Sequence, residues 1–379
     1  MPEDKGREES ASAHINMKCV AFSGGGTGGH IYPGLAVASS LKLTNSVRII
    51  WIGSHSPLDR KIVEDAGITF FAVKSGKLRR YFSFRNILDV FNIAAGYFQA
   101  RKILKKEKPA VLFSKGGFAS VPPCAAAWSL KIPLITHESD YSPGLATRIN
   151  AFFADKICLS YKESKTFFSR KIQGKTIHTG NPVRDEFRMA NAKKGFSFLG
   201  VPETEKILLV LGGSQGAKEV NDLVRETLPV LTTYFVVIHQ TGQADFEGSE
   251  QRRSDRYRPY AYIGAEMSDV LASAHLVLGR SGAGTVWESA VCGKALLLIP
   301  LAGSGTRGDQ VENARFFEQK GAATVLIHPN AEQLRAKITY LASEPGKIAS
   351  LAEAAATIGR INAVDAICAL INSILYDRF

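Results

Sequence analysis

The sequence predicts an α/β protein with two doubly wound parallel sheets, and two observations support this prediction. Short apolar runs alternate with helix-like stretches along the chain, as in parallel sheets covered by helices. A glycine-rich turn follows the first apolar run of each half: Gly24–His30 follows Cys19–Phe22, and Gly212–Gly216 follows Ile207–Leu211. A strand, a glycine turn and a helix start together aim backbone N–H groups at an anion. We therefore expect two Rossmann-like domains facing a central cleft.

The apolar runs also predict where the domains begin and end. The expected strands are Cys19–Phe22, Val47–Ile52, Thr69–Val73, Val111–Ser114, Leu134–Thr136, Lys156–Leu159 and Ile177–Thr179, then Ile207–Leu211, Phe235–Gln240, Arg258–Ile263, Leu276–Leu278, Ala295–Ile299 and Ala323–Leu326. The first domain is expected over 17–182, with a helix over Gly34–Leu41, and the second over 183–360. An amphipathic helix within 361–379 is expected to cross back onto the first domain. The polar residues 1–16 are expected to be a disordered leader.

Composition narrows the class of protein. The 379 residues are enough for two cores, and 45% hydrophobic with 22% charged residues is ordinary for a soluble globular protein. Five scattered cysteines without a C-x-x-C pair indicate a reducing compartment and no zinc site or disulfide framework. The uncharged run Gly116–Leu130 contains Pro122 and Pro123 and is too short to span a bilayer.

The positive charge is concentrated in residues 74–108. This segment has ten basic and two acidic residues, a net +8 out of +12 for the chain, and its aromatic residues lie between the basic ones. Such a mixture suits an anionic membrane surface or nucleic acid. A solvated helix with an apolar face toward the core is the alternative interpretation.

The first glycine loop matches no common nucleotide motif completely. Gly24-x-Gly26-x-x-Gly29 has the dinucleotide spacing, but the second strand ends without a carboxylate, which disfavours NAD, and no Gly-Lys-Ser/Thr follows for a P-loop. His30 comes directly after the loop. A histidine in the first turn of a helix at a cleft could act as a base or a hydrogen-bond donor.

The second half contains a similar turn, Gly279–Thr285, followed by Glu288. Thr285-x-x-Glu288 has the spacing of a capping box. A carboxylate at the start of a helix could instead accept both hydroxyls of a ribose. The sequence leaves these two interpretations equal.

Three further segments place polar residues after strands or at the domain junction. They are His137-Glu138-Ser139-Asp140, Gly180-Asn181-Pro182-Val183-Arg184 and Gly308-Asp309-Gln310-x-x-Asn313. Arg184 could bind a phosphate or only cap a helix, and the last segment could be a mobile lid or a simple loop. No Asp-x-Asp pair or other metal-ligand spacing is present. We therefore expect a bound diphosphate to be neutralised by helix N-termini and arginine, with no metal and no cofactor.

The ordered set of these motifs resembles the MurG family over nearly all of residues 17–375. The matching segments are Gly25–Gly34, His137-Glu138, Gly180–Arg184, Gly212–Ala217, Arg280–Glu288 and Gln310 with Asn313. The resemblance implies a GT-B fold and an inverting, metal-independent transfer of N-acetylglucosamine (GlcNAc). The donor is UDP-GlcNAc, and the acceptor is the 4-hydroxyl of the muramyl sugar of undecaprenyl-pyrophosphoryl-MurNAc-pentapeptide, so lipid I becomes lipid II. It further implies a role in peptidoglycan synthesis at the cytoplasmic face of the inner membrane, peripheral attachment to it, and contact with other cell-wall synthesis proteins.

The resemblance also implies roles for single residues. The candidate base is His30, with Glu138 as rival, and Thr27, Gly28 and Gly29 face the donor sugar and the acceptor diphosphate. Further donor contacts are implied for Arg184, Ser214, Ile263, Gly264, Ala283, Gly284, Thr285, Val286, Trp287, Glu288 and Gln310. Asp140 stands where the family usually has Asn, so a charged contact could replace a neutral one to a sugar hydroxyl. The uracil contact could be made by Ile263 or by Gly264, and Trp287 is bulkier than the usual residue at its position.

Other functions remain open on the sequence alone. A transferase acting on another lipid such as diacylglycerol, or a UDP-sugar epimerase, would share the architecture. A module that binds nucleic acid or a nucleotide sugar without catalysis would explain the basic segment, but it would not explain the ordered motifs. We therefore expect no nucleic-acid partner.

Overall fold

The computed structural model describes residues 17–376 apart from 27, 45, 77–83, 213–216 and 304–305. Close contacts divide the chain into two compact units. Unit 1 comprises the described residues up to Glu138, then Pro143–Pro182 and the chain from Ala363. Unit 2 comprises Ser139–Ser142 and Val183–Asn362. The expected leader 1–16 lies outside the described residues.

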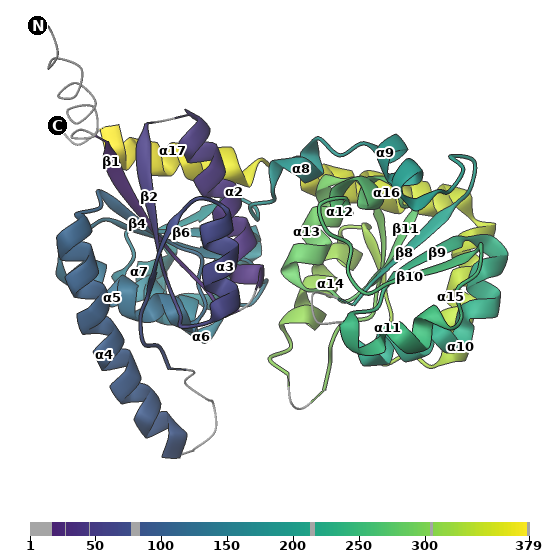
Figure 1. Ribbon diagram of the computed structural model, residues 1–379, viewed down its shortest axis with the longest axis horizontal. Coiled ribbons are helices and arrows are strands. Elements are labelled where there is room, and N and C mark those ends of the chain that lie inside the picture. The colour runs from purple at the N-terminus through teal and green to yellow at the C-terminus, as the bar shows by residue number, and fades with distance from the viewer. Residues whose placement is uncertain are drawn as a thin grey trace, which may run out of the picture. The chain divides into compact units, whose positions relative to one another are not determined.

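The described part of unit 1 contains a seven-stranded parallel sheet in the order β3-β2-β1-β4-β5-β6-β7 (Figure 1). Its strands are β1 (Lys18–Ser23), β2 (Val47–Gly53), β3 (Thr69–Ala72), β4 (Val111–Ser114), β5 (Leu134–Glu138), β6 (Lys156–Leu159) and β7 (Thr176–His178). All seven expected strands of this half are confirmed to within two residues at each end. Since parallel strands end at one edge, the segments after β1, β4 and β5 meet there.

Helices pack on both faces of the unit 1 sheet. They are α2 (Gly28–Thr44), α3 (Pro57–Asp65), α4 (Phe84–Glu107), α5 (Val121–Ser129), α6 (Leu145–Phe153) and α7 (Arg170–Gln173), with 3-10 turns η1 (Phe118–Ser120) and η2 (Lys162–Phe167). The last helix of the chain, α17 (Ala363–Tyr376), belongs to the same unit and packs against α2. Val364, Ile367 and Ile371 of α17 are buried in one apolar cluster with residues of β1 and α2.

Helix α2 starts earlier than the sequence predicts. The expected helix began at Gly34 with Pro33 near its start, but the observed helix begins at Gly28 and contains Pro33. Pro33 has no N–H to donate to the carbonyl of Gly29, and its ring crowds that carbonyl, so the helix loses one hydrogen bond there. With this start, His30 lies in the first turn of the helix, as expected from its position directly after the loop.

The described part of unit 2 contains a six-stranded parallel sheet in the order β10-β9-β8-β11-β12-β13 (Figure 1). The strands are β8 (Ile207–Leu211), β9 (Val236–Gln240), β10 (Tyr257–Tyr260), β11 (Leu276–Gly279), β12 (Ala295–Leu298) and β13 (Ala323–Val325). The expected strands are again confirmed, although β10 stops three residues before Ile263. Both β8 and β12 are buried along their whole length, as expected for strands covered by helices on both faces.

In the described part of unit 2, two helices precede the first strand, one helix lies between each pair of successive strands, and two helices follow the last strand. They are α8 (Asp185–Arg188), α9 (Ala192–Leu199), α10 (Lys218–Tyr234), α11 (Gln243–Glu250), α12 (Met267–Ser273), α13 (Ala283–Val291), α14 (Asp309–Gln319), α15 (Ala331–Ser343) and α16 (Pro345–Gly359).

One described helical stretch, 345–376, is long and apolar enough to cross a membrane by length and composition alone. It consists of α16 and α17, which lie in different units. Leu351 of α16 and Ile371 of α17 are buried in separate apolar clusters.

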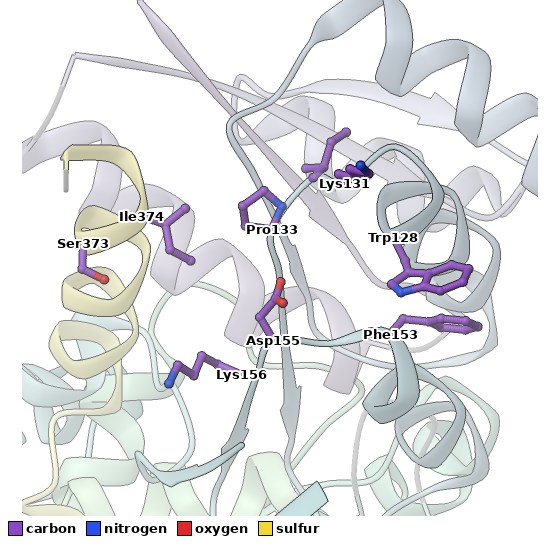
Figure 2. A pocket seen from close by; sticks show the side chains of 9 residues that line it. Trp128, Lys131, Pro133, Phe153, Asp155, Lys156, Ser373 and Ile374 are labelled. Carbon is purple, nitrogen blue, oxygen red and sulfur yellow. The ribbon is translucent and has the colours of Figure 1, made fainter. Parts of the chain in front are cut away.

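A cavity of about 540 Å³ lies in unit 1, where β5 and β6 begin (Figure 2). The rings of Trp128 and Phe153 form one wall at a centroid distance of 5.6 Å. Ile374 and Ser373 of α17 line another part. The cavity is thus at the amino edge of the sheet, opposite the edge that receives the glycine loop.

Candidate active site

His30 is the third residue of α2, and its side chain is half-buried. Its Nδ1 lies 3.3 Å from the carbonyl oxygen of Lys115, the residue after β4. A carbonyl only accepts hydrogen bonds, so in this contact Nδ1 carries the proton, and in the neutral ring Nε2 is the basic nitrogen. The position therefore favours the tautomer that a general base needs.

The backbone of two glycines, Gly116 and Gly117, lies close beside the imidazole of His30. Gly116 and Gly117 have φ angles of +84° and +76°. A Cβ on Gly117 would lie 3.0 Å from Cδ2 of His30 and 2.7 Å from the carbonyl oxygen of Gly25. Sequence reasoning did not single out this pair. The signal was a Gly-Gly dipeptide directly after an apolar strand, where the chain must turn tightly.

Asp59 fixes the glycine loop that precedes α2. Its Oδ2 accepts hydrogen bonds from the N–H of Gly26 at 2.7 Å and from the hydroxyl of Ser54 at 2.9 Å. Asp59 is buried at 3% exposure and lies in the first turn of α3, which Ser56 caps. The sequence analysis missed Asp59 as well, because its spacing to the loop, 33 residues, carries no local pattern. The N–H of Gly26 is therefore already bonded inside the protein.

Glu138, the rival candidate for the base, is hydrogen-bonded to the backbone of its own unit. It is buried at 5% exposure, and its Oε2 accepts the N–H of Gly144, the residue that caps α6. A carboxylate at a helix N-terminus stabilises that helix. Its neighbour His137 is fully buried, its Nε2 contacts the carbonyl oxygen of Gly180 at 3.0 Å, and burial lowers its pKa well below the usual value. Both side chains therefore have a clear structural role.

Gly28 and Gly29 are the first two residues of α2. Their N–H groups belong to the first turn, which has no intrahelical acceptors, so they suit an anion or a sugar hydroxyl. Thr27 and Ser214, which were expected beside substrate, lie outside the described residues.

In unit 2, α13 begins directly after a glycine turn. Gly282 is its N-cap, so Ala283, Gly284 and Thr285 form the first turn. Thr285 is thus the third helical residue, not the cap, and Glu288 is the sixth. The capping-box interpretation of this pair is wrong, because a capping box joins the N-cap to the third helical residue.

Arg184 and Glu288 lie close together. One guanidinium nitrogen of Arg184 lies 2.6 Å from Oε1 of Glu186, and the other lies 3.8 Å from Oε1 of Glu288. The guanidinium also stacks over the ring of Phe187, with 4.9 Å to its centroid. Burial raises the pKa of the Glu288 carboxyl to about 7, and the charge of Arg184 acts in the opposite direction. Since 28% of the Glu288 side chain remains exposed, a ligand can reach it.

Val286 and Trp287 point away from solvent. Val286 is fully buried, and Trp287 is 2% exposed with its ring edge-on to Phe317 at 6.0 Å. Any contact of these two residues with a donor would therefore involve their main chain. The bulk of Trp287 fills the contact between α13 and α14.

The segment after β10 contains the two expected uracil-contacting positions. Ile263 is buried and donates its N–H to Oε1 of Gln240 at 2.8 Å, whereas Gly264 is exposed. A base contact through Ile263 would thus have to use its carbonyl. Gln240 was not predicted, and its position at the end of β9 was the available signal.

Gln310 and Asp140 belong to one polar network in unit 2. The Oε1 of Gln310 accepts the N–H of Leu301 at 3.0 Å, and its carbonyl accepts the hydroxyl of Ser281 at 2.7 Å. Asp140 contacts Arg307 and Asn313. The structure thus groups Gln310 with the Arg280–Glu288 motif.

Comparison with known domain families gives the class of protein. Residues 20–159 match the glycosyltransferase family 28 N-terminal domain, and residues 207–367 match the C-terminal domain of that family. A crystal structure of MurG from Acinetobacter baumannii superposes with a TM-score of 0.73, covering 94% of this chain and 99% of that chain at 24% identity. The two sheets and these domains define a two-domain glycosyltransferase of the GT-B type.

Curated relatives narrow the class to one family. A protein of Treponema denticola is 49% identical over 82% of this chain and 84% of its own length, and one of Treponema pallidum is 45% identical over 91% and 93%. Both are named UDP-N-acetylglucosamine–N-acetylmuramyl-(pentapeptide) pyrophosphoryl-undecaprenol N-acetylglucosamine transferase. The chain belongs to this transferase family, which confirms the resemblance found in the sequence.

Proposed function

We propose that this protein transfers GlcNAc from UDP-GlcNAc to the muramyl sugar of undecaprenyl-pyrophosphoryl-MurNAc-pentapeptide, the lipid I to lipid II step of peptidoglycan synthesis. The observation that carries the proposal is the group in unit 2 formed by Arg184, Glu288 and the first turn of α13. Arg184 supplies a cation for a diphosphate, and the first turn of α13 supplies backbone N–H groups that have no acceptor within the helix. The carboxylate of Glu288 can accept hydrogen bonds from two ribose hydroxyls.

On the acceptor side, His30 is the proposed general base. The 4-hydroxyl oxygen of the acceptor attacks the anomeric carbon of GlcNAc while its proton passes to Nε2 of His30. The bond from that carbon to the phosphate oxygen breaks, and UDP leaves with the electron pair. Arg184 and the N–H groups of Ala283 and Gly284 stabilise its charge, which is electrostatic catalysis by fixed donors.

We also propose peripheral attachment to the cytoplasmic face of the membrane through residues 74–108. Leu78, Arg79, Arg80 and Phe82 lie outside the described residues, so the support comes from the described part of α4. Phe91 and Phe98 are each 68% exposed and lie seven residues apart, on the face that continues to Lys102 and Lys105. Exposed aromatics followed by lysines suit an anionic lipid surface, where each lysine contributes about 1 kcal/mol.

Liposome co-sedimentation tests the attachment. Charge reversal of Lys102 and Lys105 should weaken binding to anionic vesicles, and the wild type should be released by high salt. Charge reversal of Lys193 and Lys194, which are exposed on α9, is the matched control and should leave binding unchanged. Equal binding by both variants would contradict a membrane role for α4.

The names of the curated relatives favour this transfer over action on diacylglycerol and over a UDP-sugar epimerase. Radiolabelled UDP-GlcNAc, incubated with lipid I, diacylglycerol and no acceptor, separates the three activities. We expect label in lipid only with lipid I. Label in diacylglycerol, or conversion of the donor sugar without any acceptor, would overturn the proposal.

A further inference from the structure

Asp140 and Arg307 form an ion pair within unit 2, although they are 167 residues apart in the chain. Asp140 lies in the short segment Ser139–Ser142, and Arg307 lies just before α14. The guanidinium of Arg307 donates to Oδ2 of Asp140 and, at 2.9 Å, to Oδ2 of Asp309. Only 18% of the Asp140 side chain is exposed, so the pair is partly protected from solvent screening.

Asn313 connects this ion pair to the donor motif. It is fully buried, and its Nδ2 donates to Oδ1 of Asp140 and to the carbonyl of Ser281, each at 3.1 Å. Its Oδ1 accepts the N–H of Tyr141 at 2.9 Å. Both carboxylate oxygens of Asp140 therefore accept from protein donors. This arrangement differs from the direct sugar contact that the resemblance implied for position 140.

Gln310 is the residue that this network orients. It lies three residues after Arg307 and three before Asn313, so both of its flanks are held. Its Oε1 accepts the N–H of Leu301, which fixes the oxygen side of the carboxamide and so places the two N–H donors of Nε2 on the opposite side. A carboxamide with a fixed oxygen holds its two N–H donors in two fixed directions, and such fixed donors can distinguish between configurations of a sugar hydroxyl.

We propose that Asp140 and Arg307 are a positioning pair that sets the direction of the Gln310 carboxamide and thereby the selectivity for the sugar of the UDP-sugar donor. This inference rests on the proposed function. It assigns the pair an indirect role: neither side chain contacts the sugar, and each acts through residues 307–309 and α14.

Calorimetric titration with UDP and with UDP-GlcNAc tests the pair without turnover. The variants are Asp140→Asn, Arg307→Met and the double variant. Each single variant should weaken UDP-GlcNAc binding about tenfold and UDP binding less than about threefold, because UDP lacks the sugar. The double variant should resemble either single variant, since coupled residues are not additive. Arg335→Met removes an exposed cation of the same unit, paired with Glu226, and is the matched control.

Competition between UDP-GlcNAc and UDP-N-acetylgalactosamine (UDP-GalNAc) measures the ratio of the two affinities. Partial unfolding would lower both affinities and leave their ratio unchanged. The wild type should prefer UDP-GlcNAc, and the variants should lose about tenfold of that preference. Parallel loss of UDP binding, additive single effects or unchanged preference would each overturn the positioning role. Wild-type binding of UDP-GlcNAc without any lipid-dependent transfer would contradict the proposed function and leave the measurement on the pair valid.

Discussion

The candidate site residues of unit 1 and those of unit 2 are held in place by different kinds of interaction. In unit 1, His30 is held by a carbonyl oxygen and by two glycines without side chains. In unit 2, Arg184, Glu288 and the Asp140–Arg307 pair are held by opposite charges. The first group depends on backbone shape, and the second depends on ionisation. They should therefore respond to different perturbations: the first to changes of backbone shape, and the second to pH and charge.

The largest effect is expected at His30. His30→Ala should lower kcat about 100-fold or more, because the acceptor hydroxyl loses its base. UDP binding, measured by calorimetry, should remain, since the residues proposed to hold the UDP part of the donor lie in unit 2. His178→Ala removes an exposed histidine of unit 1 and serves as the control. A kcat within about threefold of wild type would exclude His30 as the base.

Gly117→Ala should lower kcat about tenfold, although it replaces no ionisable residue. The new methyl group would meet the His30 ring at 3.0 Å, and φ = +76° disfavours a side chain. Gly321→Ala is the matched control, because Gly321 has φ = +73° and open space around it. Denaturant unfolding should show a loss of about 1 kcal/mol for Gly321→Ala. The loss should be larger for Gly117→Ala, because its Cβ would also lie 2.7 Å from the carbonyl oxygen of Gly25. Equal kcat in both would mean that the shape around His30 is unimportant.

Donor binding should depend on pH through Glu288. With a pKa of about 7, its ionised fraction falls about tenfold from pH 8 to pH 6, and UDP-GlcNAc binding should weaken accordingly. The diphosphate diester of UDP-GlcNAc does not titrate in this range, so the protein accounts for the change. Glu288→Gln should bind weakly at both pH values, and a sloping profile for this variant would refute the assignment.

The same pKa predicts the opposite trend for the stability of the protein without ligand. The folded-state pKa lies above the ordinary value of 4.5, so the unfolded state ionises first as the pH rises. The contribution of Glu288 to the free energy of unfolding is therefore full below pH 4.5 and declines up to about pH 7. Denaturant unfolding of wild type and Glu288→Gln at about pH 5 and about pH 8 should show this difference.

The smallest expected effect is that of chelation. If Arg184 and the N-terminus of α13 neutralise the diphosphate, EDTA should change the transfer rate less than about twofold. Strict dependence of the transfer rate on added Mg²⁺ would show that Arg184 and the N-terminus of α13 are not enough to neutralise the diphosphate. Glu288→Ala, which should lose about ten- to a hundredfold in donor affinity, is a positive control for the same assay.

The strands could be predicted from the sequence because each is a short apolar run, and burial of both faces leaves a strong signal. Helix starts were harder: α2 begins six residues before the expected position, since a proline inside a helix looks like a helix start. Asp59, Gln240 and the Asp140–Arg307 pair could not be predicted, because their partners lie far away in the sequence. Such contacts are set by the register of the sheets, which local spacing does not encode.

Helix α17 has a consequence for the order in which the protein is made. Its residues complete the core around β1 and α2, so the first segment synthesised waits for the last one. Domains usually fold as they leave the ribosome, beginning at the N-terminus. Here the apolar residues of β1 and α2 remain without their partners on α17 until that helix has been made. A chain truncated before α17 would therefore expose the apolar residues of α2 that α17 covers.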